Sequence, residues 1–501
     1  MQKFLQVFEQ KIFFWIFLGL LVFIPLYPKF PLVGIPLTYV AIRLEDVFIA
    51  LGFGLAILIQ LPKLMKLYKM AIVRSYALFW FIGLVSVISA IFVTSTVLPH
   101  LAFLHWLRRI EYMSLFFMAI TAIRNLKQVK IILITFLIVT VIICLYGFGQ
   151  QWLGFPVVST TNREFSKGLI LTLTPEARVN STFAGHYDLA VYLGMVLSVI
   201  SSMFFYYRMK KENTGELKPL GGWETKSLAA GGILIIVGLL SFALLGLTAA
   251  RISFVATIIA IIASFWLTKK KLLILIFVFL SIVTVGVIPE LRHRLVATLT
   301  VSLLGGGGAK YTPDTSGEVD PAKRLTPEER QSIYDDATAS WAIEPGKKST
   351  VASDLAPGEP INTTELGVYR SFKIREDVEW PRAYRGFMRN PLLGTGYSSL
   401  GIATDNDILR LLGETGILGA TSFVLIFVIV FKKLWKQVKS GHRFAKYFGI
   451  GTIALVLGFL INGLFIDVFE ASKIATLFWG VLGINWRLGI LGEKEAYGKT
   501  S

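Results

Sequence analysis

Long apolar stretches separated by short polar segments run through most of the chain. A transmembrane helix needs about 20 mainly apolar residues, and about twelve stretches approach that length. The fourth of them is interrupted by Arg108, Arg109 and Glu111. The pattern predicts an all-α membrane protein with about twelve transmembrane helices and one large loop outside the membrane. The stretches are 12–28, 44–62, 75–95, 101–123, 131–149, 187–207, 229–248, 252–268, 271–289, 405–431, 447–466 and 471–489.

The same pattern divides the chain into a membrane domain and one insertion. We expect residues 1–289 to form spans one to nine, residues 404–490 to form spans ten to twelve, and residues 491–501 to form a tail. The insertion, 290–403, has three parts. Residues 291–304 predict an interfacial helix. Residues 305–365 lack an apolar period and predict a loop or a mobile flap. Residues 371–390 predict an amphipathic helix.

Composition and charge agree with a membrane protein and fix its expected orientation. The chain is 54% hydrophobic and 16% charged, whereas soluble proteins carry about 25% charged residues. Lys and Arg cluster on every second loop, so we expect both termini in the cytoplasm and loops 150–186 and 290–403 on the outer side. These clusters account for most of the net charge of +18. No soluble segment has the basic patch with aromatic residues that nucleic-acid binding requires.

Cysteine and histidine give no sign of a metal centre. The single cysteine, Cys144, lies within an apolar span, so we expect no disulfide framework. The five histidines are scattered without ligand spacing. The sequence therefore predicts neither a metal nor another cofactor.

The most informative segment for function is residues 391–419, PLLGTGYSSLGIATDNDILRLLGETGILG. It joins a Gly-rich turn to a polar step and then to an apolar helix that contains Glu414 and Gly416. Polar groups at the mouth of a membrane helix are costly, which indicates a use. Asp405 and Asn406 open the predicted tenth span. Both suit a helix N-cap, and Asp405 is alternatively a general base if burial raises its pKa from about 4.

Arg410 follows on the same helix. It lies four residues before Glu414, so an internal ion pair is one interpretation and contact with an anionic substrate is the other.

Two further arginines are candidates for anion binding. Arg251 lies between spans seven and eight with no acidic residue nearby in sequence, so it either binds an anion or extends to lipid phosphates. Arg375 starts the predicted amphipathic helix, where it either binds phosphate or pairs with Glu379 at i,i+4.

The segment before the sixth span adds Arg178 and His186, in EARVNSTFAGHYDLA. At the outer start of a helix, His186 can bind an acceptor sugar or act as a base, and it can equally cap or pack.

These motifs together resemble the O-antigen ligase and O-antigen polymerase family of bacterial membrane enzymes. That family has a Pro-Leu-Leu-Gly-x-Gly turn, a polar dipeptide that is often His-Asn, and a helix with Glu-x-Gly-x-x-Gly. The matching residues here are Pro391–Gly396, Asp405-Asn406, and Glu414, Gly416 and Gly419. The family also carries an Arg after a Thr-rich step, as at Arg251, and an Arg followed by Trp before the turn, as at Arg375 and Trp380. Asp405 departs from the His that is usual in the ligases.

The resemblance implies a GT-C-like helical fold and transfer of a glycan from a polyprenyl-pyrophosphate carrier, without metal or nucleotide, at the outer face of the cytoplasmic membrane. The acceptor would be a lipid, a second lipid-linked glycan or a protein. Asp405 and His186 would be catalytic, and Arg178, Arg251, Arg375, Asn406 and Arg410 would bind substrate. A transporter or flippase of lipid-linked oligosaccharide is the alternative, although the sequence shows no repeat between its halves. A noncatalytic scaffold would have no need of the polar cluster.

Overall fold

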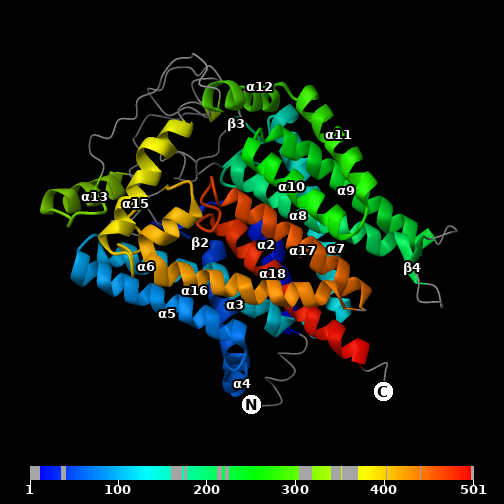
Figure 1. The fold of residues 1–501 in the computed structure, drawn as a ribbon, viewed down its shortest axis with the longest axis horizontal. Coiled ribbons are helices and arrows are strands. Elements are labelled where there is room, and N and C mark those ends of the chain that lie inside the picture. The colour runs from blue at the N-terminus through cyan, green and yellow to red at the C-terminus, as the bar shows by residue number, and fades with distance from the viewer. Residues whose placement is uncertain are drawn as a thin grey trace.

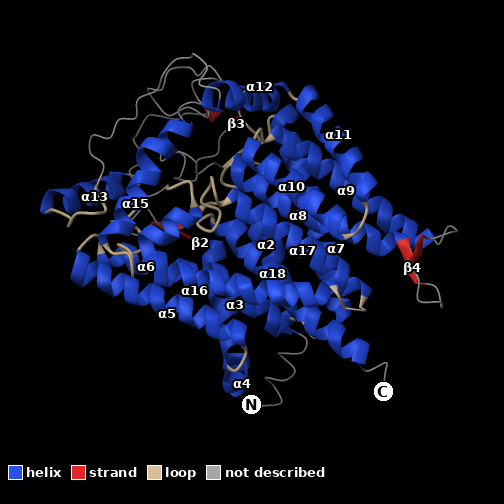
Figure 2. Cartoon of the chain, viewed as in Figure 1, coloured by secondary structure: helices blue, strands red, loops and turns tan. Residues whose placement is uncertain are grey.

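The computed structural model is almost entirely helical (Figures 1 and 2). It describes residues 12–34, 41–158, 172–173, 178–211, 217–219, 225–303, 319–339, 351–352, 371–401, 403–440 and 442–497. The strands are short pairs, β1 with β2 and β4 with β5 antiparallel, and β3 with β6 parallel. The described residues therefore form an all-α membrane protein.

The elements follow one another in this order. The first half contains α2 (Phe13–Leu26), β1 (Pro31–Gly34), β2 (Ala41–Arg43), α3 (Leu44–Gln60), η2 (Leu61–Lys63), α4 (Leu64–Tyr68), α5 (Ala71–Ser89), η3 (Ala90–Thr94), α6 (Pro99–Ala122), α7 (Leu126–Leu153), β3 (Thr172–Leu173), α8 (His186–Arg208), β4 (Met209–Lys211), β5 (Leu217–Pro219) and α9 (Thr225–Leu247). The second half contains α10 (Arg251–Leu267), α11 (Lys271–Val287), α12 (Pro289–Ala297), η4 (Thr298–Leu303), α13 (Pro327–Ala339), β6 (Val351–Ala352), η5 (Ile374–Glu379), α15 (Trp380–Arg389), α16 (Asp407–Val438), α17 (Arg443–Asn462) and α18 (Ser472–Tyr497).

Fewer helices than predicted are both long enough and apolar enough to cross a membrane. Within the described ranges, eight helices are long and apolar enough to cross a membrane: α3 with α4, α5 with η3, α7, α8, α9, α16, α17 and α18. Counting α11 and α12 as one span bent by 99° gives nine. All twelve predicted stretches fall on helices. However, α2 and α10 are short, and α6 carries charges at mid-length. The count of twelve is thus not confirmed.

The core forms where the long helices meet. Phe459 and Phe478 stack with ring centroids 4.0 Å apart. Phe469 packs edge-on against both of them, and Trp479 lies beside Phe469. Offset and edge-to-face aromatic pairs stabilise a core beyond the area they bury. This cluster joins α17 and α18 at their connecting segment 463–471, which contributes Phe469 to the cluster and carries Asp467 and Glu470 of the site.

The segment 290–403 contains one helix that the sequence analysis did not predict. Residues 305–365 were expected to form a loop, yet α13 occupies Pro327–Ala339. Thr326 and Glu329 form a reciprocal capping box, with bonds of 2.8 and 3.1 Å between each backbone N–H and the partner's side chain. Pro327 occupies the first helical turn, where a missing N–H costs nothing. The loop prediction was wrong here because the capping signal was overlooked, and the rest of 305–365 lies largely outside the described residues.

The other two parts of the insertion are helical, as predicted. Residues 290–303 form α12 and η4, and residues 374–389 form η5 and α15. Both lie beyond the ends of the long helices, on the side away from the C-terminus (Figure 1). They bring charged residues to the same end of the bundle as the starts of α8, α10 and α16.

Candidate functional site

The Gly-rich turn at residues 391–396 packs against a break in α16 and hydrogen-bonds to its backbone. The helix is interrupted at Gly416, whose φ of 64° and ψ of −168° are accessible to glycine alone. The turn supplies partners for the backbone around the break. Ile417 N–H donates to Pro391 O at 2.8 Å, and Gly396 N–H donates to Glu414 O at 2.9 Å. Backbone polar groups inside a membrane must be satisfied by protein, so this part of the motif is structural.

The glycines of this turn are required by close approach. A Cβ on Gly394 would lie 2.4 Å from the backbone carbon of Glu414, and one on Gly416 would lie 2.4 Å from the backbone of Leu392. The Ser86 hydroxyl on α5 ties the junction further by donating to Leu393 O at 2.6 Å and Glu414 O at 2.8 Å. The turn, α16 and α5 are thus held as one unit.

Beside the break lies a buried network of charged residues. Arg410 is 2% exposed and contacts Asp467 at 3.0 Å and Glu414 at 3.5 Å. Arg109 on α6 pairs with Glu470 and lies 3.8 Å from Glu414. The predicted pair between Arg410 and Glu414 is therefore confirmed. The Arg410 guanidinium already pairs with two carboxylates, so it holds the buried network together. Its direct contact with a substrate stays a prediction.

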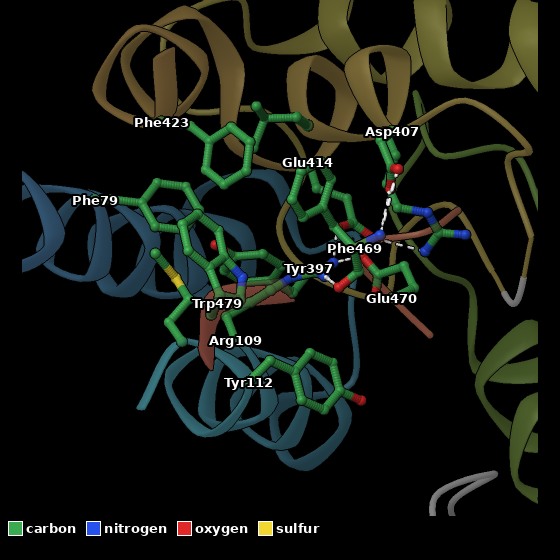
Figure 3. Close-up of a pocket in the computed structure, with 13 residues that line it drawn as sticks. Phe79, Arg109, Tyr112, Tyr397, Asp407, Glu414, Phe423, Phe469, Glu470 and Trp479 are labelled. Atoms are coloured by element: carbon green, nitrogen blue, oxygen red, sulfur yellow. Dashed lines mark hydrogen bonds and ion pairs between the residues drawn. The ribbon is translucent and has the colours of Figure 1, made fainter. Parts of the chain in front are cut away.

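The network faces a small cavity of about 40 Å³ (Figure 3). Aromatic rings line one side, including Phe79, Phe423 and Trp479, and the charged network lines the other. A cavity of this size suits a few water molecules rather than a sugar or a lipid. Each guanidinium here already faces carboxylates, so the cavity offers no surplus positive charge for a phosphate.

The start of α16 separates the roles of two residues that the sequence could not distinguish. Asn406 is the N-cap, and its side-chain oxygen accepts hydrogen bonds from Ile408 and Leu409 N–H at 3.0 Å each. Asp405 does not cap. It has a left-handed φ of 49°, which Asp tolerates better than most residues. Its carboxylate lies 2.7 Å from Arg375.

Arg375 pairs with Asp405 rather than with Glu379, which corrects one of the two sequence interpretations. Residues 374–379 form a π-helical turn, which closes bonds from i to i+5 and so shifts the i,i+4 alignment that an α-helix would give. Arg375 is 6% exposed, and it also donates to Ser371 O at 3.0 Å and Ser371 Oγ at 2.7 Å. The segments before α15 and before α16 are therefore joined at this ion pair.

The loop before α8 is held in place by buried polar groups. Arg178 and His186 Nε2 are 2.6 Å apart, and the rings of His186 and Tyr187 lie 4.0 Å apart. The Lys473 ammonium on α18 donates to the backbone oxygens of Tyr27 and Thr182. Arg178 and His186 are therefore in direct contact, and α18 fixes the loop that carries them.

Arg251 begins α10 and faces the same region. The preceding Ala249 has a φ of 47°, and Thr248 Oγ1 accepts a hydrogen bond from Ala250 N–H at 3.3 Å. The Arg251 guanidinium donates to the hydroxyl of Thr298 in η4. Within the described part of the chain it forms no ion pair with a carboxylate, so its partner is neutral.

These residues converge on the N-terminal end of α8. Four arginines, which we call the arginine cluster, are close enough for their charges to act on the Tyr187 hydroxyl: Arg178, Arg251, Arg294 and Arg375. They come from the loop before α8, from α10, from α12 and from η5. Arg294 pairs with Glu290 at 3.3 Å. The site therefore gathers four guanidinium groups, of which that of Arg294 faces Glu290 and that of Arg375 faces Asp405.

Sequence reasoning named three members of the cluster and missed Arg294. In the sequence, Arg294 appears only as one of the basic residues at the start of a predicted interfacial helix. That pattern does not indicate which distant residues Arg294 contacts. Glu379 was considered only as a partner of Arg375. It is 8% exposed, and burial, reinforced by the Asp405 carboxylate, raises its pKa to about 7. Burial also raises the pKa of Asp405, although Arg375 acts in the opposite direction.

Within the described ranges, no group of three or more His, Cys, Asp or Glu is arranged to hold a metal ion. The chain has no match among protein-family models, and no curated protein matches it.

Proposed function

We propose that the protein is a membrane glycosyltransferase of the O-antigen ligase or polymerase type. It transfers a glycan from a polyprenyl-pyrophosphate carrier to an acceptor hydroxyl at the outer face of the cytoplasmic membrane. The observation that carries this proposal is the arginine cluster, in which four guanidinium groups from four segments act on the Tyr187 hydroxyl at the end of a membrane helix.

A pyrophosphate diester is the ligand that suits such a cluster. Four like charges held together repel one another unless an anion lies between them. A guanidinium presents a rigid fork of donors that matches phosphate oxygens. Negative charge grows on the pyrophosphate as the bond to the sugar breaks, so fixed cations there stabilise the transition state more than the ground state. Arg251, whose partner among the described residues is the Thr298 hydroxyl, is the member most available for this role.

Asp405 is the candidate base for the acceptor hydroxyl. Its side chain is 31% exposed, so an acceptor can approach it. Partial burial raises the pKa of the carboxyl group, and a higher pKa makes the carboxylate a stronger general base. His186 Nε2 lies against the Arg178 guanidinium and its ring lies against Tyr187, which favours a role in orienting the cluster. We propose His186 as the catalytic base only if Asp405 is not.

Replacing Asp405 with asparagine tests the base. We expect transfer to fall by about 10²–10⁴-fold, the usual contribution of a general base. Asparagine tolerates the left-handed backbone, and Asn406 keeps the N-cap, so folding should be preserved. The measurement is single-turnover transfer with purified protein, with thermal unfolding as the control. Full activity in Asp405→Asn would pass the base role to His186 or eliminate it.

The proposal as a whole is tested by the glycan profile of a deletion strain. Loss of long surface chains with retention of single units indicates a polymerase, and accumulation of polyprenyl-linked chains indicates a ligase. The break in α16 at Gly416 also favours the alternative of a flippase, because transporters often carry discontinuous helices. Purified protein in vesicles distinguishes the two. A transferase releases polyprenyl pyrophosphate, whereas a flippase moves the intact lipid-linked oligosaccharide across the bilayer.

Orientation can be tested with single cysteines, because the native Cys144 is buried. We expect a membrane-impermeant maleimide to label Glu328→Cys on α13 in intact cells, and to label Lys69→Cys, between α4 and α5, only after permeabilisation. Both positions are exposed. The unmodified protein should stay unlabelled in both conditions. Equal labelling of the two variants in intact cells would contradict the outward placement of 290–403.

A further inference from the structure

The short helix α15 has one face packed on α16 and one face uncovered. Ala383 is 1% exposed, and a Cβ on Gly386 would lie 3.7 Å from the backbone oxygen of Gly413 on α16. The small residues on this side let the two helices approach closely. Four residues of the opposite face are exposed: Tyr384, Arg385, Met388 and Arg389. The uncovered face therefore combines apolar side chains with guanidinium groups.

The apolar part of this face meets the exposed surface of a membrane helix. Tyr384 and Met388 are 57% and 56% exposed, and Leu392, just beyond the end of α15, is 60% exposed. The Leu392 backbone oxygen accepts a hydrogen bond from Leu418 N–H at 3.2 Å. Leu418 is itself 42% exposed and lies on α16, a helix long and apolar enough to cross a membrane. The exposed apolar surfaces of α15 and α16 are thus joined at this bond.

The level of this patch in the membrane follows from α5. The 19 residues Ala71–Ser89 rise about 28 Å as a helix, which is close to the ~30 Å thickness of the hydrocarbon core. Lys69 and Arg74 mark the edge of the core at the start of α5, so Ser89 lies near the opposite edge. Asn390 Nδ2 lies 3.3 Å from Ser89 Oγ. The end of α15 is therefore placed where hydrocarbon gives way to lipid headgroups, at the same end of the bundle as the start of α16 (Figure 1).

We propose that α15 lies in the headgroup region of the membrane and binds anionic phospholipids. Tyr384, Met388 and Leu392 enter the edge of the hydrocarbon core, and Arg385 and Arg389 contact headgroup phosphates. Helices with an apolar stripe beside Lys or Arg bind anionic bilayers in this way, and tyrosine is enriched at this depth. The proposal concerns a surface that the transfer reaction does not use, so it stands apart from the proposed function.

The charge of this face selects the partner. The planar fork of a guanidinium matches the oxygens of a phosphate, and long basic side chains at this level extend to lipid phosphates. Arg385 Nε also lies 3.4 Å from Asp320 Oδ1, so we expect Arg389 to contribute more. Because α15 follows η5 directly, its binding to the membrane would hold the ion pair of Arg375 and Asp405 beside the headgroups.

The first test measures the depth of this face with a fluorophore at single cysteines. Met388→Cys and Leu392→Cys, labelled with an environment-sensitive dye, are reconstituted in vesicles of phosphatidylcholine and phosphatidylglycerol, and the native Cys144 is buried. We expect quenching by lipids with nitroxide-labelled acyl chains and protection from aqueous iodide at constant ionic strength. Glu328→Cys, at an exposed position of α13, should show the reverse.

Two outcomes of this test would overturn the proposal. Iodide quenching of Met388→Cys equal to that of Glu328→Cys would place the face in water. Protection from both quenchers would mean that another protein segment or a second copy covers it. Thermal unfolding controls for folding, and Tyr384→Cys takes the place of Leu392→Cys if that variant disturbs the turn.

The second test measures the lipid preference of the arginines and, like the first, needs no transfer activity. In labelled Met388→Cys, quenching by nitroxide-labelled phosphatidylglycerol is compared with quenching by nitroxide-labelled phosphatidylcholine at equal mole fraction. We expect the anionic lipid to be preferred, and Arg389→Gln to reduce that preference by about five-fold, the effect of one arginine near an anionic surface. Arg385→Gln should reduce it less. Arg292→Gln removes an exposed arginine from α12 instead and should change nothing. An equal response to the two lipids before any arginine is replaced, or a preference that Arg389→Gln leaves intact, would contradict binding of anionic phospholipids.

Discussion

Replacing Arg251 with alanine should reduce glycan transfer by about 10²–10³-fold, the loss seen when one preorganised donor to a developing anion is removed. The fold should survive. Within the part of the chain that the structure describes, the Arg251 side chain forms one hydrogen bond, to the Thr298 hydroxyl, and a net hydrogen bond contributes about 0.5–1.5 kcal/mol. Removal of one of four like charges also relieves repulsion within the arginine cluster. The measurement is kcat/KM with a lipid-linked donor, beside a thermal unfolding curve.

Two further variants sharpen this result. Arg251→Lys keeps the charge but loses the planar fork of donors, so its loss should be smaller than that of alanine. Arg292→Ala removes an exposed arginine from α12, the helix that carries Arg294, and should behave as wild type. If Arg251→Ala transfers glycan at the wild-type rate, Arg251 only extends to lipid phosphates and the pyrophosphate role is wrong.

The largest effect on folding is expected at Gly416. Gly416→Ala should destabilise the protein by about 3 kcal/mol or more. The backbone region it occupies costs other residues about 1–3 kcal/mol, and the new Cβ would meet the Leu392 backbone at 2.4 Å. Relief of that contact would weaken the bonds from Ile417 N–H to Pro391 O and from Leu418 N–H to Leu392 O, each a net contribution of about 0.5–1.5 kcal/mol.

Gly54→Ala is the matched control. Gly54 lies within α3, and a Cβ there would meet nothing within 4 Å. Alanine in a helix interior is favoured over glycine by about 0.5–1 kcal/mol, so this variant should be as stable as wild type or more so. Both variants can be followed by thermal unfolding in detergent and by monodispersity after purification. A Gly416→Ala protein as stable as Gly54→Ala would mean that α16 can continue through the break.

The positions of the membrane helices could be predicted from the sequence, because an apolar stretch in a bilayer has few alternatives. Its backbone groups can find partners only within a helix, so each of the twelve predicted stretches falls on one. Whether a helix crosses the membrane depends also on its length and on charged residues within it, such as Arg109. An apolar pattern in the sequence does not show how such charges are accommodated. The helix α13 was within reach of the sequence, since Thr326, Pro327 and Glu329 carry its starting signal.

The site could be predicted only in part. The sequence proposed Arg178, Arg251 and Arg375 as anion ligands, but it could not place them together or add Arg294, because they lie on segments far apart in the chain. It identified Asp405 and Asn406 as equivalent candidates for a cap. Only the structure separates them, since the cap is the residue whose side chain reaches the N–H groups of Ile408 and Leu409.

The chain by itself therefore determines the helices, the glycines of the turn and the residue types available for chemistry, because these follow from local backbone and solvation requirements. The tertiary structure alone decides which charges meet. It turns Arg375 toward Asp405 through a π-helical turn, commits Arg410 to Asp467 and Glu414, and leaves Glu379 buried beside both Arg375 and Asp405. The physical reason is that the energy of a charge in a membrane protein depends on neighbours within a few ångströms, and those neighbours are brought by helix packing from distant parts of the chain.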